Sequence, residues 1–406
     1  MNYFSENPHL SDNKMDGPPP QQDQARVNSI HSRLNHNNNK DPLTQSAATT
    51  LPAKSGDVIS SGNYIVTVSL GTPAKQLSLI FDTGSDLTWT QCRPCVRSCY
   101  TQSEPIFDPS LSASYKTISC TTAACTQLSS LGVEQSCFDS TCLYTAVYGD
   151  MSFSFGVFGS EKLTLTSTDV FEGFLFGCGL DNEVLFDGST GLLGLGRGNI
   201  SIVEQTANKY NRFFSYCLPS TSCSPGYLRF GKGGGSSNAI KFTTLSTVSQ
   251  GDSYYGLNLT GINVGGTKLP ISASVFSRGT IIDSGTVITR LPPAAYSALR
   301  AAFLQAMMSY PRTEDVFDIF DTCYNFSSFK TVSYPSISFV FGDGLTQDLD
   351  ATGIFYVESV DKVCLAFIEN EDDSHIGIIG NVQQKRLKVV YDVGGGKVGF
   401  APAGCP

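Results

Sequence analysis

The chain reads LIFDTGS at residues 79–85 and TIIDSGT at residues 280–286. In both stretches an apolar run leads into an aspartate, which is followed by a hydroxyl residue, a glycine and a second hydroxyl residue. An apolar-apolar-glycine triplet follows each stretch about a hundred residues later, at 192–194 and at 378–380. This repeat predicts a duplicated protein with two lobes of similar layout.

Two aspartates, Asp82 and Asp283, stand at the centre of the repeat. The glycine after each of them permits a tight turn in which a backbone N–H approaches the carboxylate, and the flanking hydroxyls can hydrogen-bond that carboxylate and hold it in place. One such turn also occurs in ordinary loops, but two of them in matching halves favour a paired site. The residues expected to support the pair are Thr83, Gly84, Ser85, Ser284, Gly285 and Thr286.

The two carboxylates converge if the two lobes face each other. Carboxylates about 3 Å apart cannot both ionise cheaply, so they share a proton and titrate as a coupled pair. One can then act as a base toward water while the other protonates a carbonyl oxygen. This chemistry needs neither histidine nor a metal or other cofactor.

The composition excludes several other classes of hydrolase. The 406 residues include 4 histidines, and only His375 lies beyond residue 40. A triad-type serine or cysteine hydrolase would need that histidine beside its nucleophile, and the H-E-x-x-H motif of helical zinc hydrolases is missing from the sequence. The net charge of -9 argues against general nucleic-acid binding, because phosphate contacts need clustered Lys and Arg.

The pattern beyond residue 57 predicts a mostly β protein. Short runs rich in Val, Ile, Leu, Phe and Tyr alternate with Gly, Ser, Asn and Pro. The clearest helix is expected at 294–310, directly after a proline pair. We therefore expect a bilobal fold with a few short helices, lobes at 58–228 and 229–406, and a glycine-rich seam near 231–237.

Residues 1–57 are polar and rich in Asn, Gln, Pro and Ser, so we expect a largely flexible leader. One short helix is expected inside it, because Val27, Ile30 and Leu34 fall on one face at helical spacing. A helical face needs something to pack on, which favours a pro-segment, removed near residues 51–62, over a simple tail. The leader shows no apolar stretch of a signal peptide, and the chain has no apolar run of about 18 residues that could span a membrane.

Thirteen cysteines are many for a reduced cytosolic protein. The spacing of Cys92 and Cys95 is compatible with a zinc module, but no histidine lies near to complete it, so a disulfide framework is favoured. Three N-x-S/T sequons, at Asn199, Asn258 and Asn325, are glycosylation candidates and agree with secretion. We expect a secreted (apoplastic) or vacuolar protein without a membrane anchor, with a plastid location as the alternative.

The two aspartate turns and the two glycine triplets, taken in their order along the chain, resemble motifs of the pepsin-like aspartic proteases. The resemblance is strongest to the plant branch that is nepenthesin-like or chloroplast-nucleoid-protease-like. The resemblance covers about residues 58–406. Tyr148, Gly149 and Asp150 resemble the tip of the flap that closes over the substrate, whereas Met151 stands where the branch usually has glycine. Trp89, the only tryptophan, stands where the family places an indole behind its flap tyrosine.

The resemblance implies a monomeric aspartic endopeptidase, made as a precursor and active at acidic pH on peptide or protein substrates. Segments 191–196 and 378–381 resemble the paired loops behind the two aspartates, and the cysteines between 92 and 142 are similar to the insertion that marks this branch. By this similarity Cys223 stays unpaired and six disulfides form: Cys92–Cys95, Cys99–Cys178, Cys120–Cys142, Cys125–Cys137, Cys217–Cys405 and Cys323–Cys364.

Two other functions compete with the protease. Some plant proteins with this fold are binding proteins or inhibitors of glycan-degrading enzymes and have lost catalytic parts, but here both aspartates and the flap tyrosine are intact. A nucleic-acid role has been attached to relatives in this branch and would need a basic patch. The leader instead carries five Lys or Arg against six Asp or Glu, so nucleic acid is not an expected partner.

Overall fold

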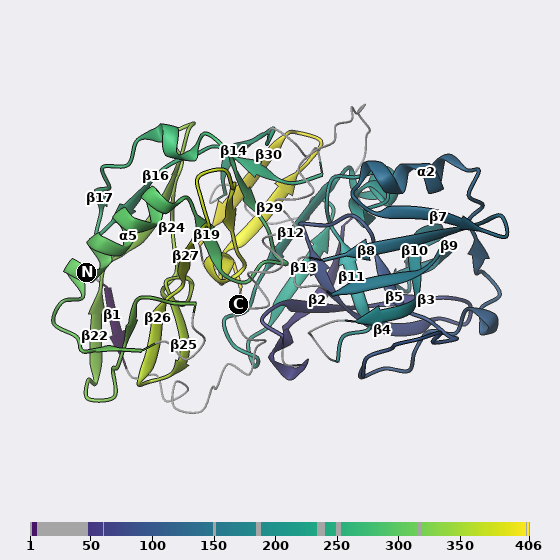
Figure 1. The fold of residues 1–406 in the computed structure, drawn as a ribbon, viewed down its shortest axis with the longest axis horizontal. Helices are drawn as coiled ribbons and strands as arrows, with labels where there is room; N and C mark the ends of the chain where they lie inside the picture. The colour runs from purple at the N-terminus through teal and green to yellow at the C-terminus, as the bar shows by residue number, and fades with distance from the viewer. Residues whose placement is uncertain are drawn as a thin grey trace.

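The mostly β, bilobal fold is confirmed (Figure 1). Two lobes lie side by side, and a sheet between them contains strands from both halves of the sequence. The computed structural model describes residues 2–5, 48–59, 61–148, 152–183, 188–233, 240–248, 253–314, 319–402 and 404–405.

In the described residues of its first half, the chain forms strands, three short helices and two 3-10 turns. The strands are β1 (Asn2–Ser5), β2 (Thr49–Ser55), β3 (Tyr64–Leu70), β4 (Lys75–Asp82), β5 (Trp89–Gln91), β6 (Lys116–Thr117), β7 (Glu134–Phe138), β8 (Thr141–Val147), β9 (Phe153–Thr166), β10 (Asp169–Glu183), β11 (Gly191–Gly194), β12 (Phe213–Cys217) and β13 (Gly226–Phe230). The helical segments are η1 (Gly56–Ile59), η2 (Pro109–Leu111), α2 (Ala123–Ser130), α3 (Ile202–Gln205) and α4 (Ala207–Tyr210).

The second half repeats this β-rich plan around one longer helix, α5 (Pro293–Ala306). Its strands are β14 (Lys241–Ser246), β15 (Gly256–Leu257), β16 (Leu259–Val264), β17 (Thr267–Lys268), β18 (Thr280–Ile282), β19 (Thr289–Leu291), β20 (Arg312–Thr313), β21 (Cys323–Tyr324), β22 (Thr331–Tyr334), β23 (Ile337–Phe341), β24 (Thr346–Asp348), β25 (Phe355–Ser359), β26 (Lys362–Leu365), β27 (Phe367–Glu369), β28 (Gly377–Ile379), β29 (Lys388–Asp392) and β30 (Lys397–Ala401). The 3-10 turns in the described part of this half are η4 (Ala273–Phe276), η5 (Ala351–Gly353) and η6 (Val382–Gln384).

The sequence repeat corresponds to a repeated arrangement of strands. In the first lobe β4 delivers Asp82 and lies parallel to β11, with Gly194 beside Asp82. In the second lobe β18 runs into Asp283 and lies parallel to β28, with Ile379 beside Ile282. Each apolar-apolar-glycine triplet therefore lies against the strand that carries an aspartate.

An antiparallel sheet joins the lobes in the order β2–β13–β12–β29–β30–β14. The pairing between lobes is made by β12 and β29, where Phe214 lies opposite Tyr391. Their rings stack with centroids 4.4 Å apart, so buried aromatic contact reinforces the backbone hydrogen bonds between the lobes.

The expected leader includes a strand of the folded body. Residues 49–55 form β2, which pairs with both β13 and β3 and alternates buried with exposed positions. Leu51 and Ala53 are only 3% and 2% exposed, so residues 49–55 of the expected leader belong to the folded body. The expected leader helix lies outside the described residues, and the expected lobe boundary at 228/229 falls within β13.

Helix α5 confirms the helix expected at 294–310, with its end four residues earlier. Two prolines stand at its start, and its buried face contains Tyr296, Leu299 and Phe303. The expected apolar stripe is therefore a core-packing face.

The disulfide framework is confirmed, but four of the expected pairs are wrong. Cys217–Cys405 and Cys323–Cys364 form as expected. The other bonds are Cys92–Cys178, Cys95–Cys99, Cys120–Cys137 and Cys125–Cys142, and Cys223 is unpaired and exposed.

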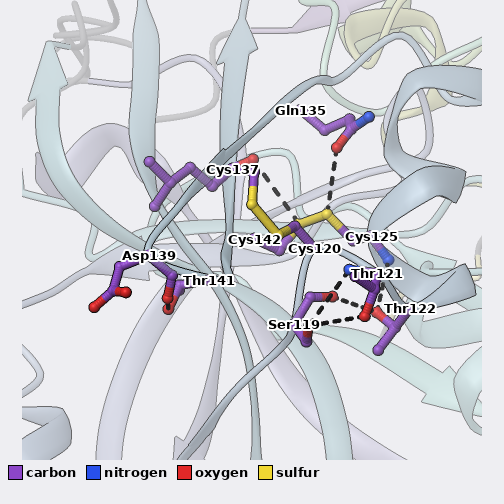
Figure 2. The surroundings of a disulfide bond; sticks show 11 residues. Ser119, Cys120, Thr121, Thr122, Cys125, Gln135, Cys137, Asp139, Thr141 and Cys142 are labelled. Carbon is purple, nitrogen blue, oxygen red and sulfur yellow. Dashed lines mark hydrogen bonds between the residues drawn. A yellow bond between two sulfur atoms is a disulfide. The ribbon is translucent and has the colours of Figure 1, made fainter.

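Strand pairing explains the actual bonds. β5 runs parallel to β10 with Thr90 beside Cys178, and the Cys92 N–H donates to Gly179 O, which brings Cys92 against Cys178. In the second group, buried Cys142 shares an apolar cluster with Cys125, whereas Cys137 is exposed and bonds Cys120 (Figure 2).

Candidate active site

The turn after β4 holds the carboxylate of Asp82 at two points. The Gly84 N–H donates to Asp82 Oδ1 at 2.9 Å, and the Ser85 hydroxyl donates to Asp82 Oδ2. Asp82 has no exposed surface, so these donors replace the water that an exposed carboxylate would bind.

The turn after β18 repeats this arrangement around Asp283. The Gly285 N–H donates to Asp283 Oδ1 at 2.9 Å, and the Thr286 hydroxyl donates to Oδ2 at 2.6 Å. The two carboxylates meet across Gly84, because a Cβ on that glycine would lie 2.7 Å from Asp283 Oδ1. Only a residue without a side chain allows this approach.

The residues directly after the aspartates connect the two lobes. The Ser284 N–H donates to Thr83 Oγ1 at 2.9 Å, and the Thr83 N–H donates to Ser284 Oγ at 3.1 Å. The Ser284 hydroxyl in turn donates to Phe81 O at 3.0 Å. Thr83 and Ser284, which were expected to support the pair, therefore join the two turns across the lobes.

Two threonines that the sequence reasoning missed support the turns from behind. Thr88 Oγ1 accepts the Gly194 N–H at 3.2 Å, and Thr289 Oγ1 accepts the Gly380 N–H at 3.0 Å. Each threonine stands six residues after its aspartate. Extending the repeat by six positions would have identified both.

A buried polar network lies beneath the second aspartate. Gln384 Nε2 donates to Asp283 O at 3.1 Å and to Ile379 O at 3.0 Å, and its Oε1 accepts the Tyr216 hydroxyl. The Tyr216 hydroxyl lies 2.9 Å from that of Tyr391. Burial raises the pKa of both phenols well above 10, so they stay protonated and can donate hydrogen bonds.

Tyr148, which the sequence identifies as a candidate flap tyrosine, lies beside Trp89. Trp89 Nε1 donates to the Tyr148 hydroxyl at 2.7 Å, and the ring centroids are 6.5 Å apart. The Tyr148 N–H donates to Ser152 O at 2.8 Å, closing the hairpin between β8 and β9. Gly149, Asp150 and Met151 lie outside the described residues.

The three glycosylation candidates differ in exposure. Asn199 and Asn258 are exposed, and Asn325 is half-buried. Among the described residues, no group of three or more His, Cys, Asp or Glu side chains could hold a metal ion. Within the same part of the chain, no helix is long and apolar enough to cross a membrane.

Comparison with known proteins identifies the family. A xylanase inhibitor N-terminal model matches residues 64–232, and a xylanase inhibitor C-terminal model matches residues 254–402. An Arabidopsis thaliana aspartyl protease family protein is 57% identical over 385 residues, which cover 94% of this chain and 81% of that protein. Nepenthesin-1 from Nepenthes gracilis, an aspartic proteinase, is 38% identical over 355 residues, which cover 85% of this chain and 78% of that protein.

The chain belongs to the plant nepenthesin-like branch of the pepsin-like aspartic proteases. Solved structures show the same fold for this pepsin-like chain. Basic 7S globulin from soybean has a TM-score of 0.70 at 20% identity, covering 88% of this chain and 97% of that one. An aspartic proteinase from Irpex lacteus has a TM-score of 0.62 at 20% identity, with the same coverage.

Proposed function

We propose that this protein is an aspartic endopeptidase that hydrolyses peptide bonds with a water molecule activated between Asp82 and Asp283. The observation that carries the proposal is the pair of matched turns. Each turn holds its carboxylate with one N–H and one hydroxyl, and each brings that carboxylate to the same glycine between the lobes.

The mechanism uses the two carboxylates in different protonation states. Aspartic proteases are the standard example of two such groups sharing one proton. The ionised carboxylate takes a proton from water as its oxygen attacks the peptide carbon, and the protonated carboxyl donates to the carbonyl oxygen. The tetrahedral intermediate then collapses, the C–N bond breaks, and the leaving nitrogen takes a proton from the dyad.

The surrounding residues keep this geometry fixed. The Thr83–Ser284 contacts hold the carboxylates at one separation, so little reorganisation is needed as charge moves during the reaction. A substrate peptide would lie extended between the lobes, partly through main-chain hydrogen bonds, with Tyr148 and Trp89 along one wall.

The protein is proposed to work as a monomer at acidic pH after removal of a leader. Sharing one proton requires a pH low enough to protonate one of the two carboxyls. Six disulfides favour an oxidising compartment, and we infer an extracellular or vacuolar location.

A non-catalytic binding or inhibitor function is the second candidate, because both matching family models are described as xylanase inhibitor. One assay distinguishes the two functions. The oxidised, leader-free protein is incubated with a denatured protein substrate between about pH 3 and 5, with and without an aspartyl-directed inhibitor. Cleavage that the inhibitor abolishes supports the protease, and no cleavage across this range contradicts it.

A further inference from the structure

One apolar cluster extends from the cysteine-rich insertion to the flap. Its buried members include Cys125 and Leu128 of α2 and, from the site, Trp89, Tyr148 and Leu192. Leu128 and Trp89 have no exposed surface. The insertion is therefore packed into the same core that carries the flap tyrosine.

Strand β8 orders this packing. Cys142, Tyr144 and Ala146 are its buried positions, and buried Tyr148 continues the alternation directly after its end. Because alternate residues of a strand face the same side, the side to which Tyr148 points follows from the register of β8. The same side of β8 is covalently linked to α2, since buried Cys142 is bonded to Cys125.

Beyond the flap tyrosine, contacts continue to the dyad. Trp89 donates to the Tyr148 hydroxyl at 2.7 Å and lies opposite Leu192 in the pairing of β5 with β11. The same β11 strand places Gly194 beside Asp82. Tyr148 therefore lies between the insertion and the strand that supports an aspartate.

We propose that the insertion, residues 120–142, positions Tyr148, with Leu128 as the positioning residue because it is the buried leucine of α2 in the apolar cluster that contains Trp89 and Tyr148. The proposal rests on the proposed protease function for its kinetic consequence. Its structural consequence does not depend on activity, because Trp89 is the only tryptophan and its fluorescence reports the environment of the flap tyrosine.

The test compares Leu128→Ala with Ser129→Ala, an exposed neighbour on the same helix. We expect Leu128→Ala to increase acrylamide quenching of Trp89 at least twofold and to raise KM about tenfold with kcat changed less than twofold, because flap contacts bind the substrate before the chemical step. Ser129→Ala should match the wild type. Normal far-UV circular dichroism establishes that each variant is folded.

A double-mutant cycle with Tyr148→Ala separates positioning from general destabilisation. If the insertion acts through the flap tyrosine, Leu128→Ala should change KM by less than twofold in the Tyr148→Ala background. If Leu128→Ala does not fold, the pair Cys120→Ser and Cys137→Ser removes the outer crosslink and should increase quenching in the same direction. Folded variants with wild-type quenching and KM would overturn the proposal, whereas altered quenching without any peptidase activity would contradict only the proposed function.

Discussion

The most quantitative prediction concerns Lys385, a lysine buried between the lobes. It is 6% exposed and lines a small cavity with Asp57, Tyr64 and Tyr356. Burial lowers the pKa of Lys385 to about 8 from its ordinary 10.5, although the carboxylate of Asp57 favours the charged form. Burying the charged ammonium of Lys385 therefore lowers the unfolding free energy of the protein.

The size of that cost follows from the two pKa values. A difference of about 2.5 corresponds to about 3 kcal/mol of unfolding free energy. Between about pH 8 and 10.5 the unfolded chain binds the proton more readily, so this group makes stability rise with pH. Below about pH 8 the folded and the unfolded states both bind the proton, so the unfolding free energy is lowered by the full amount of about 3 kcal/mol.

Replacing Lys385 with Met should therefore stabilise the protein by up to about 3 kcal/mol at pH 6, and this advantage should shrink toward zero near pH 10.5. Urea unfolding of both proteins between these pH values measures it. The control is Lys330→Met, at an exposed lysine, which should stay within about 0.5 kcal/mol of the wild type throughout. A Lys385→Met advantage that does not depend on pH, or a loss of stability at pH 6, would refute the reasoning.

Three further predictions concern other buried contacts. Burial opposes ionisation of Asp169, but hydrogen bonds from Lys209, Thr49 and Thr166 outweigh it and lower the pKa of Asp169 well below 3.8. Asp169→Asn should therefore destabilise the protein at pH 6. In urea unfolding, the gap in unfolding free energy between wild type and variant should narrow below about pH 4. Ser284→Ala leaves the buried Thr83 N–H without its acceptor. The variant should lose about 1–3 kcal/mol of unfolding free energy in thermal unfolding and should have a reduced kcat. An unchanged melting temperature would show that the contact does not stabilise the protein. The sequence alone places leader removal near residues 51–62, but β2 at 49–55 belongs to the sheet that joins the lobes. Amino-terminal sequencing of active material should therefore find a first residue before Thr49, and an active form that begins after Ser55 would contradict this.

The sequence repeat predicted the two-lobed fold and the convergence of the two aspartate turns, because both depend on short local patterns. Apolar strands that lead into Asp82 and Asp283, together with two later glycine triplets, define the pairings of β4 with β11 and of β18 with β28. The contact between Trp89 and Tyr148 followed from family resemblance, since nothing local relates two residues that are 59 positions apart.

The features that were missed depend on how distant segments are oriented. Thr83 and Ser284 bond across the lobes, which the sequence of either turn alone does not indicate. The clustered cysteines were mispaired for a similar reason. Several thiols lie within reach of one another along the chain, and only strand pairing and burial decide which sulfurs meet. The two expected pairs whose cysteines all lie beyond residue 200, Cys217–Cys405 and Cys323–Cys364, were predicted correctly.

The central claim is that Asp82 and Asp283 together activate water. The most direct measurement is the initial rate of peptide cleavage by leader-free, oxidised protein, compared with the variants Asp82→Ala and Asp283→Ala. Circular dichroism should show that both variants keep the fold. The account predicts that either substitution reduces kcat by at least about a thousandfold, because neither carboxylate can take both proton-transfer roles alone. A folded variant that retains more than about a tenth of wild-type activity would contradict it.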